Sequence, residues 1–178
     1  MTEWSFEERD CPICGEGRLE SVPLGQRGGA AHHAGLGVET TLVRCRTCHG
    51  VYPSPTPIPR ESPYQEHSPD SYFRQHDSAA KVRAGERLAL QAERLTGSSG
   101  RMLELGCGRG ELLRGAANRG WDVAGVDLTE SYAAVARSEF GVEVEVAPAE
   151  SAQALGQGWD CILLAAVLEH VYEPRVLI

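Results

Sequence analysis

A glycine-rich stretch near the middle of the chain constrains the fold more than any other feature. The apolar run 101–105 ends in glycines at alternate positions, Gly106, Gly108 and Gly110, and an amphipathic helical pattern begins directly afterwards. This order predicts a strand, a tight turn and a helix, the opening of a βαβ unit. Glycines let the backbone turn sharply and approach a ligand closely, and the helix N-terminus points its free N–H groups at the same place.

The spacing of these glycines limits the ligand. A dinucleotide fingerprint, G-x-G-x-x-G, would need glycine where the chain has Glu111, and an acid there would repel a pyrophosphate. The pattern Glu104-x-Gly-x-Gly-x-Gly instead resembles motif I of the class I S-adenosylmethionine-dependent methyltransferases. The resemblance implies that Glu104 holds the ammonium group of the cofactor, directly or through water, and that Gly106, Gly108 and Gly110 line its site. The alternative is a glycine turn that binds no nucleotide.

Composition narrows the remaining classes of protein. The chain has 178 residues, room for about one domain and a small module, and 42% of them are hydrophobic, enough for a core. A net charge of -8 argues against a non-specific grip on nucleic acid, and no apolar run reaches the length of a membrane span. Of the six cysteines, four form C-x-x-C pairs, which is typical of metal binding in a reducing compartment. We therefore expect a cytoplasmic protein with no nucleic-acid or membrane partner.

The two C-x-x-C pairs predict a structural zinc site in a zinc-ribbon module at residues 8–50. Each pair would place two thiolates on one tight turn, and together they offer the closed tetrahedral shell of a structural Zn²⁺. The four expected ligands are Cys11, Cys14, Cys45 and Cys48. Residues 18–22 and 39–43 alternate like the strands of a hairpin, and the stretch from Gly25 to Gly37 between them resembles a flexible insertion. A glycine just after each pair, Gly15 and Gly50, is expected to relieve the backbone.

Other readings of these cysteines are free thiols, two redox pairs, or a site in which His49 replaces one sulfur. A redox C-x-x-C should open a helix in a thioredoxin-like βαβ unit, and neither pair does. A closed site with four cysteine ligands has no open coordination position, so this zinc is expected to take no part in chemistry.

A proline-rich linker is expected at residues 51–70, because six prolines between Val51 and Pro69 favour an extended connector. A helical pattern resumes near Ser71 and ends before Gly97, with Tyr72 and Phe73 anchoring its start. This helix either covers the mouth of the cofactor site or serves packing alone.

Beyond the glycine turn and the helix 112–119, the pattern continues as a strand at 122–127, a helix at 130–140 and a strand at 142–146. Asp127 ends the first of these strands about twenty residues after Gly106, where an acid accepts bonds from both ribose hydroxyls of a nucleotide. The alternative for Asp127 is a helix cap, for which Thr129 is better placed. In related enzymes an Asp after the third strand accepts from the adenine amino group. Here that position is Pro148, so Glu150 is the candidate substitute, or else it begins a short helix at 151–155.

The apolar run 159–167 predicts a fourth strand buried on both faces. With strands ordered 3-2-1-4, the switch point lies between the first and fourth strands, where open α/β sheets bind ligands. Leu168-Glu169-His170-Val171 follows this strand and resembles a motif of quinone-type and related small-molecule methyltransferases. Glu169 and His170 are thus expected to face the reaction centre, with His170 able to take a proton from the acceptor. The alternative for His170 is a helix-start residue bonded to backbone. Some quinone O-methyltransferases hold a divalent metal with E-V-x-E-H, but Ala166 stands at the first Glu position, so no catalytic metal is expected.

The order of the parts extends the resemblance over nearly the whole chain, to bacterial methyltransferases with an N-terminal zinc ribbon. It implies an α/β fold, a Rossmann-like methyltransferase sheet preceded by a small zinc-ribbon module, with the cofactor domain at 71–178. It also implies methyl transfer from S-adenosylmethionine to a small-molecule acceptor. Two rivals remain: a non-catalytic partner-binding module, and an NAD-linked oxidoreductase that Glu111 disfavours.

The methyltransferase fold normally has seven strands, and only four are expected here. We therefore expect an incomplete sheet in a fragment or truncated product, with little methyl transfer by the chain alone. The exposed edge of the fourth strand would then invite self-association.

Overall fold

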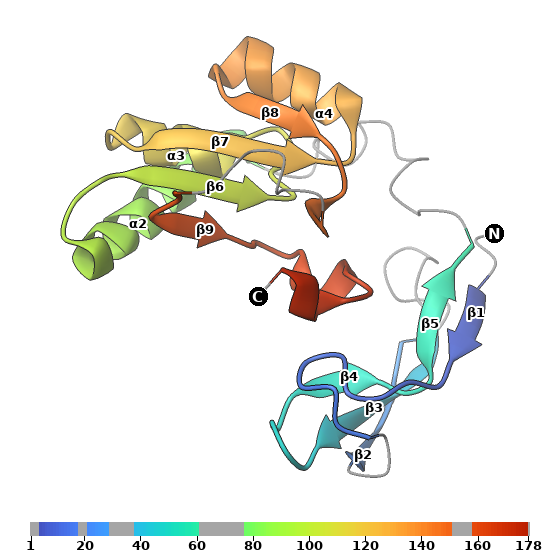
Figure 1. Ribbon diagram of the computed structural model, residues 1–178. Coiled ribbons are helices and arrows are strands. Elements are labelled where there is room, and N and C mark those ends of the chain that lie inside the picture. The colour runs from blue at the N-terminus through green and yellow to red at the C-terminus, as the bar shows by residue number, and fades with distance from the viewer. Residues whose placement is uncertain (1–3, 18–20, 29–37, 61–76, 151–157, 178) are drawn as a thin grey trace. The chain divides into compact units, whose positions relative to one another are not determined.

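The computed structural model describes residues 4–17, 21–28, 38–60, 77–150 and 158–177, and the chain forms two compact units. The first contains residues 1–66 together with 172–178, and the second contains residues 67–171. Figure 1 shows the elements of both. Each unit has its own cluster of buried side chains.

The first unit is built from short antiparallel strands. β2 (Ser21–Arg27), β3 (Thr40–Cys45) and β4 (Val51–Pro53) form a three-stranded sheet in that order. The pairing of β2 with β3 confirms the expected hairpin. β2 runs on past Gly25 into the stretch expected to be a flexible insertion, with a register shift between Pro23 and Gly25. Residues 29–37 of that stretch lie outside the described residues.

Two strands lie in the range that was expected to be a linker. β4 pairs with β3, and β5 (Thr56–Pro59) pairs antiparallel with β1 (Trp4–Glu7). Within the described residues β5 has one neighbour, and prolines are tolerated in such edge strands because the N–H they lack would face away from the ladder. Residues 51–53 and 56–59 are therefore strands of the first unit, separated by a bend at residues 54–55. Residues 61–76 lie outside the described residues.

The second unit is a parallel sheet with helices. Its strands are β6 (Arg101–Leu105), β7 (Asp122–Asp127), β8 (Glu143–Val146) and β9 (Cys161–Leu163). Their order is β8-β7-β6-β9 and every pairing is parallel, which confirms the expected order 3-2-1-4. The helices are α2 (Ser78–Thr96), α3 (Glu111–Asn118) and α4 (Glu130–Val135), the last continuing as the π-helical turn η3 (Ala136–Phe140).

α2 packs closely on α3 in this unit (Figure 1). A Cβ at Gly85 of α2 would collide with the backbone of Leu112, and one at Gly115 of α3 would collide with the backbone of Val82, so the absence of side chains lets the helices approach. The N-cap of α2 is Asp77, whose carboxylate accepts the Ala80 N–H, and its C-cap Gly97 is left-handed. The expected end before Gly97 is thus confirmed, while Tyr72 and Phe73 lie outside the described residues.

The fourth strand differs from its prediction. β9 covers three residues, not the apolar run 159–167, and Ile162 is 50% exposed, so the strand is not buried on both faces. Among the described residues β9 pairs with β6 alone, so the apolar run lacks the second neighbour that would extend and cover it. The chain leaves the sheet at Leu164 and continues to the 3-10 turn η5 (Leu168–His170).

Candidate functional site

The glycine turn joins β6 to α3 in a conformation that favours glycine at three positions. Gly106, Gly108 and Gly110 have φ of 70°, 54° and 79°, all in the left-handed region that residues with a Cβ rarely adopt. The N–H groups of Gly106 and Cys107 donate to the Val126 carbonyl at 2.7 and 3.0 Å. The turn is therefore tied to the carboxyl end of β7, the neighbouring strand.

Asp127, the last residue of β7, fastens the same turn through its side chain. Its Oδ2 accepts the Gly108 N–H at 2.7 Å and its Oδ1 accepts the Thr129 N–H at 2.9 Å. Thr129 is the N-cap of α4, but its own side chain makes no capping bond. The carboxylate is 9% exposed, and each oxygen keeps a further lone pair. Asp127 thus lies beside the glycine turn, and ribose binding by this residue stays a prediction.

Glu104 lies in β6 directly before the turn and is the most deeply buried acid described here. It is 2% exposed, and its Oε2 has no hydrogen-bond partner among the described residues. Burial raises the pKa of this carboxyl well above its usual value, the charges of Glu111 and Asp127 raise it further, and Lys81 opposes them. A buried polar atom without a partner is rare in folded proteins, and a cation supplied by a ligand would satisfy this one.

Glu111 is a third buried acid next to the glycine turn, and it was not among the residues predicted to bind the cofactor. It is the first residue of α3 and is 4% exposed. The Ser78 hydroxyl donates to its Oε1 at 3.4 Å, and Arg109 Nε lies 3.9 Å from the same oxygen. The signal available in the sequence was an acid in the first turn of a helix directly after the glycines, where the helix dipole favours negative charge.

The segment after β9 approaches the glycine turn through Val167. A Cβ built on Gly106 would lie 2.5 Å from Val167 Cγ2, so the two residues pack together. Ala166, just before, is left-handed with φ of 57°, an unusual conformation for a residue with a Cβ. The His170 N–H donates to the Val167 carbonyl at 2.8 Å, and the residue ends η5 instead of starting a helix. Glu169 and His170 are exposed. A role for either side chain stays a prediction.

Glu150 is exposed and follows β8, so it lies on the side of the sheet where β6 and β7 also end. Contact with adenine stays a prediction. The short helix expected at 151–155 lies outside the described residues.

In the first unit, the four expected zinc ligands come together. The Sγ atoms of Cys11, Cys14, Cys45 and Cys48 all lie within 4.8 Å of one another. Two of the separations are 3.7 Å, between Cys11 and Cys48, and 3.6 Å, between Cys14 and Cys45. A tetrahedron with Zn–S bonds of about 2.3 Å has edges of about 3.8 Å, so the spacing fits zinc.

Each C-x-x-C pair lies on a tight turn, called a knuckle here, and the knuckles that begin at Cys11 and Cys45 share one backbone hydrogen-bond pattern. The Gly15 N–H donates to the Cys11 carbonyl at 2.8 Å, and the His49 N–H donates to the Cys45 carbonyl at 3.1 Å. Both residues are left-handed, so the expected glycine relief is present at Gly15, whereas His49 rather than Gly50 takes that place in the second knuckle. Gly50 instead donates its N–H to Cys48 Sγ at 3.4 Å. His49 is thus part of the turn itself.

Among the described residues, no helix is both long and apolar enough to span a membrane.

A family model described as "Methyltransferase domain" matches residues 45–178. A ubiquinone biosynthesis O-methyltransferase of Hahella chejuensis is 36% identical over 98 residues, which cover 52% of this chain and 41% of that protein. Another, from a Caulobacter species, is 38% identical over 80 residues, covering 42% and 32%. The chain thus spans less than half the length of these curated relatives.

Solved structures with a similar fold are also methyltransferases. The plantazolicin methyltransferase BpumL in complex with SAH matches with a TM-score of 0.52 and 16% identity, covering 61% of this chain and 44% of that one. SAM-bound CalS10, an amino pentose methyltransferase from Micromonospora echinaspora, matches with a TM-score of 0.51 and 21% identity, covering 66% and 49%. At these identities the likeness shows a shared fold.

Proposed function

This chain belongs to the methyltransferase domain family, and on that premise we propose that it binds S-adenosylmethionine at the glycine turn and passes the methyl group to a small-molecule acceptor. One observation carries the proposal: Glu104, buried directly before the turn, holds a carboxylate oxygen with no partner among the described residues. The methionine end of the cofactor bears an ammonium group, which would supply the missing donors and the opposite charge.

The neighbouring residues suit the rest of such a ligand. Asp127 keeps one further lone pair on each oxygen after binding the turn, which leaves acceptors for two ribose hydroxyls. The left-handed glycines let the backbone come close to the ligand. Glu150, at the same end of the sheet, is the candidate acceptor for the adenine amino group.

The buried Glu111 separates this proposal from a dinucleotide enzyme. A pyrophosphate binds at a helix N-terminus through free N–H groups and the positive dipole. In this chain that position carries Glu111, which is 4% exposed. Glu104 and Asp127 are also buried, and the charges of Glu111 and Asp127 both raise the pKa of Glu104. A phosphate-bearing ligand would be repelled, whereas a cationic ligand is attracted.

The cofactor supplies an activated methyl group, and the protein's part is mainly to align an acceptor with it. His170, in η5 after β9, is proposed to take the acceptor's proton when one is lost. The closed set of four sulfurs is proposed to hold one structural Zn²⁺, which stabilises the first unit and has no open position for chemistry. Four thiolate ligands are retained in a reducing compartment, so the cytoplasm is the proposed location.

We also propose that β9 supports self-association. Its outer edge is unpaired among the described residues and Ile162 is half exposed, so a strand from a second molecule could add there. Ile162→Lys should shift a sedimenting dimer toward monomer. A species of the same size before and after the change would contradict this.

Calorimetric titration of the zinc-loaded chain with S-adenosylhomocysteine tests the main proposal, with NAD as the control ligand. We expect binding of the first and none of the second. Radiolabelled S-adenosylmethionine and a small-molecule extract then test transfer. No binding of S-adenosylhomocysteine at about 1 mM would refute the proposal and favour the non-catalytic module.

A further inference from the structure

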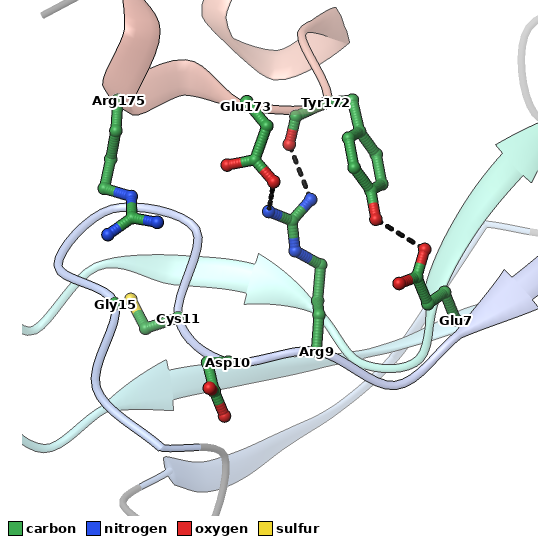
Figure 2. Close-up of a pocket in the computed structure, with 8 residues that line it drawn as sticks. All are labelled: Glu7, Arg9, Asp10, Cys11, Gly15, Tyr172, Glu173 and Arg175. Atoms are coloured by element: carbon green, nitrogen blue, oxygen red, sulfur yellow. Dashed lines mark hydrogen bonds and ion pairs between the residues drawn. The ribbon is translucent and has the colours of Figure 1, made fainter.

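The first unit holds the segment that follows His170 through one arginine. Arg9 lies between β1 and the first cysteine knuckle, and its guanidinium donates to the Tyr172 carbonyl and to Glu173 Oε1, both at 2.6 Å (Figure 2). The same guanidinium stacks on the Tyr172 ring, 4.2 Å from its centroid. The Tyr172 hydroxyl in turn donates to Glu7 at the end of β1. Three kinds of contact therefore converge on residues 172–173.

This arrangement is specific to arginine. The guanidinium fork bonds two acceptors at once while its plane lies on an aromatic ring, which a lysine ammonium cannot do. The Arg9 side chain is only 11% exposed, so its contacts are shielded from water more than an ordinary surface ion pair. Glu173 remains 39% exposed, so Arg9 rather than its partner is the buried centre of the contact.

The contact is linked to the cysteine knuckle by position and by packing. Arg9 precedes Cys11 by two residues. Arg175 lies against the same knuckle, because a Cβ built on Gly15 would be 2.5 Å from its Nη1 (Figure 2). The backbone of Arg9 thus leads directly into the turn that carries Cys11 and Cys14.

Residues 168–171 connect, along the chain, contacts made within the second unit to contacts made within the first. On one side, within the second unit, Val167 packs on Gly106 and Ala166 takes its left-handed conformation. On the other side, within the first unit, Tyr172 and Glu173 bind Arg9. Glu169 and His170 lie between these anchors in the sequence.

We propose that Arg9 is a positioning residue: it docks residues 172–173 on the cysteine module and so orders the segment of the first unit that directly follows Glu169 and His170 in the sequence. The relevance of this ordering to methyl transfer rests on the proposed function, but the docking itself does not. The metal site then has a use beyond stabilising its own module, because an ordered first knuckle keeps Arg9 in place.

Amide hydrogen exchange, followed by NMR on the zinc-loaded chain, tests the docking directly. The reporters are the N–H groups of Val176 and Leu177, each bonded within a local turn of the docked segment. Arg9→Ala should speed their exchange by about three- to thirtyfold, the loss expected for a charge-assisted contact that is partly exposed. Arg9→Lys should restore part of the protection, and zinc chelation of the wild-type chain should mimic Arg9→Ala.

Arg44→Ala is the matched control, since Arg44 is an exposed arginine of β3 in the same module. It should leave exchange unchanged. Unaltered exchange in Arg9→Ala, or equal acceleration in Arg44→Ala, would overturn the proposal, as would loss of bound zinc from Arg9→Ala, because the effect would then be general unfolding. S-adenosylhomocysteine affinity is measured alongside. If the wild-type chain does not bind it, the proposed function fails while the exchange data still decide the docking.

Discussion

Replacing Glu104 by Gln should stabilise the ligand-free protein and weaken its cofactor binding, two effects of opposite sign from one atom. The substitution keeps the size of the side chain and removes its ability to ionise. In the structure this carboxyl is 2% exposed, and its Oε2 lacks a hydrogen-bond partner among the described residues. The ionised form is therefore costly until a cation arrives.

The size of the stability effect follows from the direction of the pKa shift. Burial, with Glu111 and Asp127 adding to it, raises the pKa of Glu104 in the folded state well above its ordinary value of 4.5. The stabilisation from this group is complete below the unfolded pKa and is lost as pH rises toward the folded pKa. Within that window the folded state binds one more proton, so wild-type stability falls by about 1.4 kcal/mol for each pH unit. Glu104→Gln lacks this contribution.

Binding should move the other way. A carboxylate that meets an ammonium makes charge-assisted hydrogen bonds worth roughly 1.5–3 kcal/mol, so Glu104→Gln should weaken S-adenosylhomocysteine binding by about ten- to a hundredfold. Wild-type affinity should also fall on acidification through the folded pKa, because the proton must leave before the ammonium binds. The variant should lose that dependence.

Urea unfolding of the zinc-loaded chain between about pH 5.5 and about pH 7.5 would measure the slope, and calorimetry at each pH would measure affinity. Tryptophan fluorescence can follow the parallel-sheet unit, since Trp121 and Trp159 lie in it. Equal pH slopes for the two proteins would show that the pKa of Glu104 is not raised in the folded state. An unchanged dissociation constant would remove Glu104 from the cofactor site.

Other substitutions test the remaining parts of the site. Cys11→Ser should lower bound zinc from about one per chain and abolish the melting transition of the first unit, measured by elemental analysis and calorimetry; full metal content in this variant would contradict the ligand set. Asp127→Ala should weaken S-adenosylhomocysteine binding by about ten- to a hundredfold in calorimetry, because an acceptor for hydroxyl groups and an anchor of the turn are both lost. Gly106→Ala should cost roughly 2–4 kcal/mol of unfolding free energy, since a left-handed residue with a Cβ is strained and this Cβ would meet Val167. Gly141→Ala, left-handed but with open space around it, should cost only about 1 kcal/mol, and equal losses in the two would show that the contact with Val167 is unimportant.

The features that the sequence determined by itself are those encoded in short windows. The left-handed turn after β6 follows from three alternating glycines, and parallel strands follow from apolar runs alternating with helical periods, while their order 3-2-1-4 was implied by the resemblance to methyltransferases. The meeting of four sulfurs follows from two C-x-x-C pairs, since each pair places two thiolates on one tight turn and neither opens a helix. In each case a local steric or chemical requirement admits few alternatives, so the residues involved reveal the structure.

Tertiary structure decided what depends on residues distant in the chain. Proline spacing predicted a connector at 51–70, but β4 and β5 form there because β3 and β1 offer partners. The apolar run 159–167 predicted a long buried strand, but β9 stops at Leu163 because among the described residues only β6 lies beside it. The burial of Glu111, and the contacts of Arg9 with Tyr172 and Glu173 across more than 160 residues of sequence, depend on residues that no short window contains. Burial and pairing are properties of what surrounds a residue, and only the folded chain brings those surroundings together.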